Sequence, residues 1–441
     1  MATIEAHRSR PARGRRSVDG GAPRPIPGWL AACGMLFAVA WGGNEFTPLL
    51  VMYRLDSGMS VQIVNILLGA YVLGIVPALL VGGPLSDRYG RRPLMVPAPI
   101  LCVVGSGLLA LGSDSVALLF AGRVFSGLAL GLVMAVGTSW VKELSQAPFD
   151  PGASTGAGAV RASLSLTLGF LLGAVVAAAI AQFSPLSAVL PYAVNIVLTV
   201  LLAVVMLRAP ETHSRRARGD GVASGRLLDD LLVPAALHRR FLLVVVPMAP
   251  WVFGASATAY AVLPNLVVHR VPGYEVGFSG LLCLVALACG VLSQQVAKRV
   301  DSPHSSRAVV VALSMAAVGM VLAVPAASTL TVPMALVAAA VLGAAYGLLL
   351  VSGLQEVQRI AGPDRLAGLT AVYYSLTYLG FFVPAVLEGL TRWFDYPTMC
   401  AVGAVLALLS VVVVAFSWRR HLPTVVDPAD PRAPRAFQGR A

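Results

Sequence analysis

The sequence predicts an all-α membrane protein with twelve transmembrane helices, and three observations carry that prediction. Hydrophobic residues make up 57% of the 441 residues and charged residues only 12%, with a mean hydropathy of +0.81. This charged fraction is about half of that in soluble proteins, so a water-soluble fold is excluded. Long apolar runs recur along the chain, and Lys and Arg gather in alternate loops between them.

Each apolar run is long enough to cross a hydrocarbon layer of ~30 Å as a helix. Six runs precede a polar, arginine-rich stretch and six follow it; they cover residues 28–52, 61–82, 94–113, 116–140, 160–183, 186–208, 241–266, 276–297, 307–328, 331–354, 367–388 and 397–418. We therefore expect an N-terminal bundle of six helices over 28–208, a linker over 209–240 and a second bundle of six over 241–418.

The two ends of the chain, residues 1–27 and 419–441, are basic and rich in proline, which predicts disordered tails at a membrane surface. Five cysteines all lie inside apolar runs, with no CxxC pair and no histidine nearby. This distribution favours neither a disulfide framework nor a metal site.

The distribution of positive charge gives the orientation. If the N-terminus is cytoplasmic, the inner segments hold 28 of the 32 Lys and Arg residues and the outer loops hold 3, with Arg123 inside a span. Positive charge accumulates on the cytoplasmic side of membrane proteins, so both termini and the linker are expected inside the cell, in the plasma membrane. The net charge of +12 is then a topological signal, and we expect no nucleic-acid partner.

Between the second and third runs lies a short charged segment, GGPLSDRYGRR, over residues 82–92. Its spacing predicts a tight loop, since Gly83 and Gly90 permit close approach of the backbone and Pro84 resists continuation of the preceding helix. The pattern closely resembles the signature between spans 2 and 3 of the major facilitator superfamily of secondary transporters; it consists of Gly83, Leu85, Asp87, Arg88, Gly90, Arg91 and Arg92.

This resemblance implies two six-helix bundles that rock about a central cavity lined mainly by spans 1, 4, 7 and 10. It also implies that contacts of the charged segment close the cytoplasmic side. We expect Asp87 to lie near the start of span 11, around 364–368, and Arg91 to contact Glu143 at the end of span 4.

Two charges stand well inside the predicted spans, Glu45 in span 1 and Arg123 in span 4. Both are about seven residues from the outer end, a depth of roughly 10 Å, so we expect them to meet. Charges inside hydrocarbon are costly and mark functional sites, and the proton on Glu45 would depend on Arg123 and on substrate. We expect a proton-coupling pair, with Glu45 also contacting substrate; the alternative is a static ion pair that locks the bundle.

Arg123 with Gly127 and Gly131 is similar to the arginine motif of span 4 in proton-driven members of the superfamily. Aromatic residues with polar tips on spans 7 and 11 suit an amphipathic or cationic organic ligand. The expected substrate contacts are Asn44, Glu45, Trp251, Tyr260, Asn265, Tyr374 and Tyr378.

Together these features predict a proton-coupled exporter of small amphipathic organic compounds, whose partners are substrate, protons and the lipid bilayer. The six histidines lie in loops or tails and no HExxH, GxSxG or GxxxxGK motif is present, so we expect neither an enzyme nor a cofactor. We expect a monomer. An uptake symporter or facilitator for a nutrient such as a sugar or organic acid is the main alternative, and a non-transporting receptor or scaffold is the third.

Overall fold

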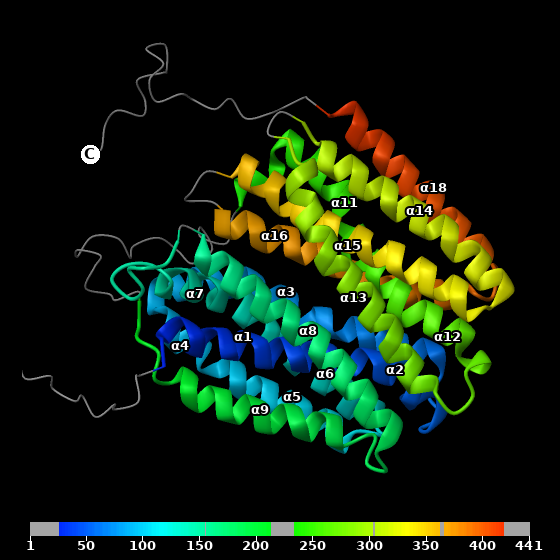
Figure 1. The fold of residues 1–441 in the computed structure, drawn as a ribbon, viewed down its shortest axis with the longest axis horizontal. Coiled ribbons are helices and arrows are strands. Elements are labelled where there is room, and N and C mark those ends of the chain that lie inside the picture. Colours follow the sequence, from blue (N-terminus) through cyan, green and yellow to red (C-terminus); the bar gives the residue numbers. More distant parts are fainter. Residues whose placement is uncertain (1–25, 155, 213–232, 303–304, 362–365, 419–441) are drawn as a thin grey trace, which may run out of the picture.

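The computed structural model describes residues 26–154, 156–212, 233–302, 305–361 and 366–418. Nearly all of both expected tails and most of the expected linker lie outside these residues. The described helices run side by side along one direction, and the beginning of α1 and the end of α18 lie at the same end of the molecule (Figure 1).

The helices of the first half match the predicted runs closely. They are α1 (Gly28–Asn44), α2 (Phe46–Leu55), α3 (Val61–Tyr89), α4 (Arg91–Met95), α5 (Pro97–Leu111), α6 (Val116–Leu132), α7 (Thr138–Leu144), α8 (Ala157–Phe183) and α9 (Leu190–Met206). Those of the second half are α11 (Val246–Ala257), α12 (Leu263–Val267), α13 (Glu275–Val300), α14 (Arg307–Thr329), α15 (Val332–Ile360), α16 (Leu366–Tyr378), α17 (Val383–Leu390) and α18 (Tyr396–Phe416).

Within the described ranges, 11 helical stretches are long and apolar enough to cross a membrane. Helix α9 is a shorter apolar helix of 17 residues, which extends roughly 25 Å and so lies at the lower limit for a span. A twelfth span therefore depends on α9 and stays a prediction.

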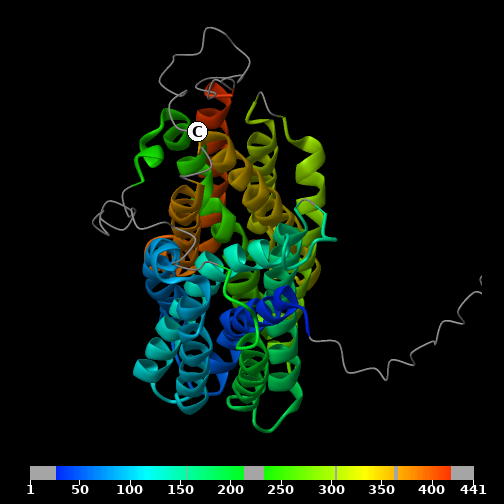
Figure 2. The same cartoon turned by 90° about the vertical axis from the view of Figure 1, so that its left-hand side faces the viewer.

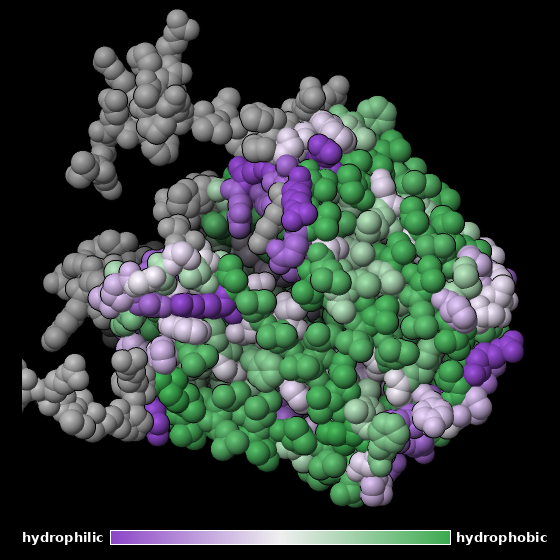
Figure 3. Space-filling model, in the orientation of Figure 1, coloured by the Kyte–Doolittle hydropathy of each residue, from purple (hydrophilic) through white to green (hydrophobic). Residues whose placement is uncertain are grey.

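The helices form two groups, one from each half of the chain, as the view along the helices shows (Figure 2). Apolar side chains cover the visible face between the two ends, and hydrophilic side chains gather at those ends (Figure 3). Exposed leucine, valine and isoleucine side chains recur along the outward faces of these helices. Such an apolar belt is the surface that a lipid bilayer solvates.

Small residues bring the helices of the first half close together. A Cβ atom added at Gly74 of α3 would lie 2.1 Å from the carbonyl oxygen of Val124, and one added at Gly127 of α6 would lie 2.1 Å from that of Tyr71. Helices in membranes associate through such close backbone packing, because lipid tails are as apolar as the helices themselves. The spacing of Gly127 and Gly131 thus has a packing role.

The first span is broken at Glu45, between α1 and α2. Pro48 explains the break, because it has no N–H for the carbonyl of Asn44 and its ring crowds that carbonyl. Asn44 and Glu45 consequently lie at the bend of the span, in its buried interior.

Two further spans contain wide π-helical turns. One, Val133–Gly137, joins α6 to α7, and the other, Thr258–Val262, joins α11 to α12. In the second, Pro264 crowds the carbonyl of Tyr260 four residues earlier and so disfavours the regular helix. Such turns frequently occur at functional sites because they redirect side chains.

The charged segment over 82–92 differs from the predicted tight loop. Helix α3 continues through Pro84 to Tyr89, and the chain reverses only at Gly90, whose φ of 104° favours glycine. A Cβ added at Gly83 would meet nothing within 4 Å, so the close approach expected there is absent. The prediction was wrong because a proline in a helix can bend it without ending it, and the polar last turns are stabilised by side-chain contacts.

Three residues of the first half form hydrogen bonds with the second half near the expected outer loops. Arg54 donates to Asn265 Oδ1 at 3.0 Å, Gln182 donates to the carbonyl of Gly273 at 2.8 Å, and Asn65 donates to that of Pro384 at 3.3 Å. These residues lie at the ends of α2, α8 and α3 nearest those loops. In this conformation the halves are therefore tied together at the expected outer end.

Candidate functional site

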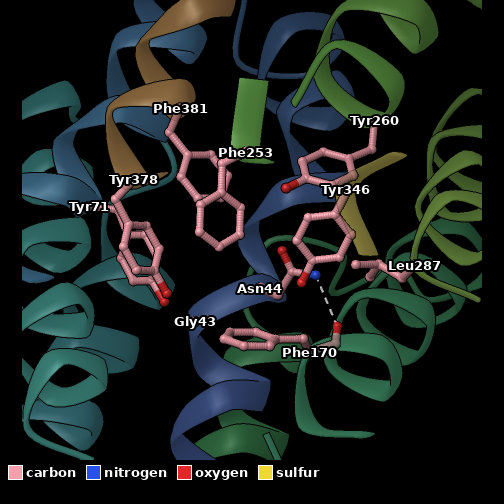
Figure 4. Close-up of a pocket in the computed structure, with 10 residues that line it drawn as sticks. All are labelled: Gly43, Asn44, Tyr71, Phe170, Phe253, Tyr260, Leu287, Tyr346, Tyr378 and Phe381. Carbon is pink, nitrogen blue, oxygen red and sulfur yellow. Dashed lines mark hydrogen bonds between the residues drawn. The ribbon is translucent and has the colours of Figure 1, made fainter. Parts of the chain in front are cut away.

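A cavity lies between the two halves of the chain and is lined by residues from both (Figure 4). Its volume in this conformation is about 20 Å³, room for about one water molecule, so a larger ligand requires the two halves to move apart. Its lining consists of Gly43, Asn44, Tyr71, Phe170, Phe253, Tyr260, Leu287, Tyr346, Tyr378 and Phe381. A ligand in this cavity would contact both halves at once.

Aromatic rings form most of the wall. Phe253 stacks on Tyr378 with ring centroids 4.5 Å apart and on Phe381 at 4.8 Å, and it lies 5.6 Å from Tyr346. A planar ring placed against such a wall gains about 0.5–1.5 kcal/mol for each aromatic pair beyond the burial of its area. The wall is suited to flat apolar molecules.

The polar groups of the cavity are few, and several are already paired. Asn44 donates to the carbonyl of Phe170 at 2.9 Å, the Tyr260 hydroxyl lies 3.1 Å from that of Ser256, and the Tyr378 hydroxyl donates to Met134 Sδ at 3.2 Å. Tyr260 and Met134 each belong to a π-helical turn; the first lines the cavity, and the second is the partner of a lining residue. None of the ten lining residues carries a formal charge.

Three predicted substrate contacts, Asn44, Tyr260 and Tyr378, line the cavity, and four do not. Trp251 donates to Ser410 Oγ on α18, at 3.2 Å. Asn265 accepts Arg54 in the contact between the halves, and Tyr374 packs on Tyr373 at 5.6 Å. Residue type alone does not reveal which face of its helix a side chain occupies, so the positions of these three residues were not predictable. Glu45 is the fourth.

Glu45 is fully buried and faces the inside of the first half, away from the cavity lining. Ser106 of α5 donates to Glu45 Oε1 at 3.4 Å, and also to Asn195 Oδ1 at 2.9 Å. Asn195 of α9 in turn donates to the carbonyl of Ala38 at 2.9 Å. The other oxygen, Glu45 Oε2, is buried and has no hydrogen-bond partner within the described ranges. The carboxyl group therefore belongs to a polar network between α1, α5 and α9.

Arg123 is 1% exposed and does not form the expected direct pair with Glu45. Its guanidinium lies between two rings, 4.6 Å from the centroid of Phe46 and 4.2 Å from that of Tyr71. It donates to the carbonyls of Leu67 and Gly43, both at 3.3 Å. The prediction that the two charges meet rested only on their equal depth in the membrane. In the structure, cation–π contacts and backbone carbonyls are the partners of Arg123 instead. It remains close enough to act on Glu45 electrostatically.

The charged segment forms a network at the end of the first half where Gly90 lies. Arg91 donates to Asp87 Oδ1 at 2.6 Å and, through Nε and Nη2, to Glu143 Oε1 at 3.1 and 2.8 Å. The expected contact between Arg91 and Glu143 is thus present. Arg88 lies half-buried on the last turn of α3. The expected contact of Asp87 with 364–368 involves residues outside the described ranges and stays a prediction.

Sequence reasoning missed the residues that complete this network. Glu211 accepts hydrogen bonds from the backbone N–H groups of Arg91 and Arg92 at 3.0 and 2.8 Å, which caps the start of α4. Thr212 donates to Glu143, and Arg92 donates to the carbonyl of Leu207 at 2.6 Å. The expected linker therefore begins as a segment docked on the bundle. A carboxylate directly after Arg208-Ala209-Pro210 was the available signal.

A second buried charge cluster lies in the other half. Arg240 is 0% exposed and donates to Glu356 at 2.7 Å through Nε and 3.0 Å through Nη2. Arg359 joins Glu356 at 2.7 Å and Asp301 at 2.6 Å. Because the predicted spans began at 241 and ended at 354, these charges were expected outside them. In the structure α15 continues to Ile360.

Comparisons with known proteins agree with this architecture. A family model described as Major Facilitator Superfamily matches residues 30–385. A POT family transporter crystallised with 5-aminolevulinic acid superimposes with a TM-score of 0.71 at 13% identity, covering 90% of this chain and 97% of that one. The proton:xylose symporter XylE superimposes with a TM-score of 0.61 at 15% identity, covering 88% and 94%. At these identities the likeness concerns the fold alone.

Curated relatives match shorter segments. The human solute carrier family 2, facilitated glucose transporter member 12, is 31% identical over 131 residues, which is 27% of this chain and 21% of the relative. Multidrug resistance protein MdtL from Escherichia coli is 34% identical over 76 residues, which is 17% of this chain and 19% of the relative. The aligned part therefore spans about a fifth of each relative. With a family model matched over most of its length, this chain belongs to the Major Facilitator Superfamily.

Proposed function

We propose that this multi-pass membrane protein is a proton-coupled exporter of small amphipathic organic compounds, acting by alternating access. The observation that carries the proposal is Glu45, a carboxyl group buried inside the first half with one oxygen unpartnered, next to a cavity shared by both halves. A buried carboxyl group is stable in its neutral form and can ionise when its surroundings change, which is what a proton carrier needs.

The remaining parts of the proposal rest on the sequence. The protein has twelve spans, with α9 as the sixth, and both termini and the linker lie in the cytoplasm. It resides in the plasma membrane as a monomer. The two helix groups are the bundles that alternate. The networks of Arg91 with Glu143 and of Arg240 with Glu356 hold the expected cytoplasmic ends of the bundles.

The cavity supports amphipathic aromatic compounds as substrates. Its wall offers stacked rings, and Asn44, Tyr260 and Tyr378 already have partners within the protein. A sugar would need many free donors and acceptors for its hydroxyl groups, and few remain on the lining. Glu45 does not line the cavity, so we no longer propose it as a substrate ligand and assign it the proton alone.

Nutrient uptake is the second candidate, because the human relative is named as a facilitated glucose transporter. The segment similar to MdtL, named for multidrug resistance, favours export. Both matches are short, so the choice between these functions rests on the chemistry of the cavity.

Proteoliposomes with an imposed pH gradient test the proposal. We expect ethidium, a planar aromatic cation, to accumulate on the acidic side at the expense of the gradient, and a protonophore to abolish the accumulation. D-glucose in parallel vesicles should not move. Proton-linked entry of glucose without ethidium movement would establish the uptake function instead, and inertness toward both probes would reject coupled transport of either class.

A further inference from the structure

Tyr71 of α3 contacts both the cavity and the buried cation. Its ring lies under the Arg123 guanidinium, 4.2 Å from ring centroid to Cζ. The same ring makes edge contacts with two other lining residues, Tyr378 at 6.5 Å and Phe381 at 6.4 Å (Figure 4). In the described part of the chain, Tyr71 alone of the ten lining residues makes a ring contact with Arg123. Whatever moves this ring acts on Arg123.

The Tyr71 hydroxyl is placed where a ligand can act on it. The group is buried and has no hydrogen-bond partner among the described residues, which is unfavourable unless something else pairs with it. It packs against α1 at Gly43, where an added Cβ would lie 2.3 Å from it. Arg123 donates to the carbonyl of the same Gly43, two residues before Glu45. The hydroxyl and the guanidinium thus both act at Gly43, two residues before Glu45 and the bend of the first span.

We propose that Tyr71 is the positioning residue that makes the proton on Glu45 depend on cavity occupancy, an inference that rests on the proposed function. A ligand that stacks in the cavity and pairs with the Tyr71 hydroxyl draws the ring away from Arg123. The guanidinium then loses one of its two ring contacts and turns toward the unpartnered Glu45 Oε2. The O–H bond of the carboxylic acid breaks, the electron pair stays on the carboxylate, and the proton passes to water.

This mechanism separates the substrate site from the proton site. The ligand never touches Glu45, and coupling passes through one aromatic ring. Five titratable or charged side chains lie around Glu45, one from each of five surrounding helices: Tyr53 on α2, Tyr71 on α3, Cys102 on α5, Arg123 on α6 and Tyr192 on α9. Glu45 is the one carboxyl group in this set, and the phenols and the thiol ordinarily titrate above pH 8.

The test measures ethidium binding to the purified full-length protein in detergent as a function of pH, together with protons released per ethidium bound. If one proton leaves on binding, wild-type affinity rises by about tenfold per pH unit over the pH range in which Glu45 is protonated in the free protein and ionised in the complex. Tyr71→Leu removes the ring, so we expect ethidium still to bind the remaining aromatic wall but with an affinity independent of pH. Tyr71→Phe keeps the ring over Arg123, so the pH slope remains, while affinity falls by about fivefold through the lost hydroxyl.

Phe37→Leu is the matched control. Phe37 of α1 packs on Trp41 with ring centroids 5.9 Å apart, and within the described residues it neither lines the cavity nor makes a ring contact with Arg123, so this variant should keep both ethidium affinity and its pH slope. Tyr71→Met, which fills similar space without a ring, replaces Tyr71→Leu if that variant is not recovered folded. A wild-type pH slope in both ringless variants would overturn the role of Tyr71. Ethidium binding to wild-type protein that releases no proton would instead refute the proposed function.

Discussion

Replacing Glu356 by Gln removes the anion from the buried cluster of the second half. Glu356 and Arg240 are 1% and 0% exposed, and the carboxylate accepts two hydrogen bonds from Arg240 and one from Arg359. Removing one partner of a buried ion pair costs about 3–5 kcal/mol, because the other charge stays desolvated. We expect the lower value, about 3 kcal/mol, because Arg240 also donates to Ser306.

A loss of this size corresponds to a fall in Tm of roughly 6–12 °C for a unit of 150–250 residues. Four of the five free cysteines are buried, so a thiol-reactive fluorescent dye reports unfolding of the detergent-solubilised protein during heating. The matched control is Asp150→Asn, which breaks a 2.7 Å pair with Arg161 in which both side chains are 24% exposed. Such a pair contributes about 0.2–1 kcal/mol, so Tm should fall by no more than roughly 4 °C. Equal shifts in the two variants would refute the argument from burial.

Three further predictions concern packing, the charged segment and topology. Gly127→Ala should abolish folded protein, since its Cβ would lie 2.1 Å from a carbonyl oxygen of α3. In Gly83→Ala the added Cβ would have no atom within 4 Å, so Tm should be unchanged. Equal recovery of the two variants in size-exclusion chromatography would contradict this. Asp87→Asn should greatly reduce ethidium flux at nearly normal expression, because it removes an anionic partner of Arg91, and full flux would reduce the segment to a topology signal. A cysteine replacing Ser57 should react with an impermeant maleimide in intact cells and one replacing Ser214 should not; the reverse pattern would invert the membrane orientation.

The helical layout was predictable because a hydrocarbon layer fixes the length of its spans. Residues 241–266 and 307–328, for example, were expected as spans and lie within helical stretches of the structure. The ends were less predictable, since α3 and α15 continue as polar helix beyond their apolar stretch. Hydropathy locates the apolar part of a helix and does not register the ion pairs that stabilise its last turns.

The site was only partly predictable, because the sequence gives the depth of a residue and not the face it occupies. Asn44 and Glu45 are adjacent, yet Asn44 lines the cavity and Glu45 faces α5 and α9. Consecutive helical residues point about 100° apart, and the break at Glu45 makes the direction still harder to derive. Arg240 and Glu356 are 116 positions apart, so no local pattern announced their contact.

The measurement that tests the central claim most directly compares two modes of ethidium transport in proteoliposomes carrying Glu45→Gln. Accumulation driven by a pH gradient requires a proton to bind and leave, whereas exchange of labelled for unlabelled ethidium at equal pH does not. Glutamine resembles the protonated carboxyl group and cannot ionise, so we expect the variant to lose gradient-driven accumulation and to retain exchange. Gradient-driven accumulation at the wild-type rate in Glu45→Gln would contradict the assignment of the proton to this residue.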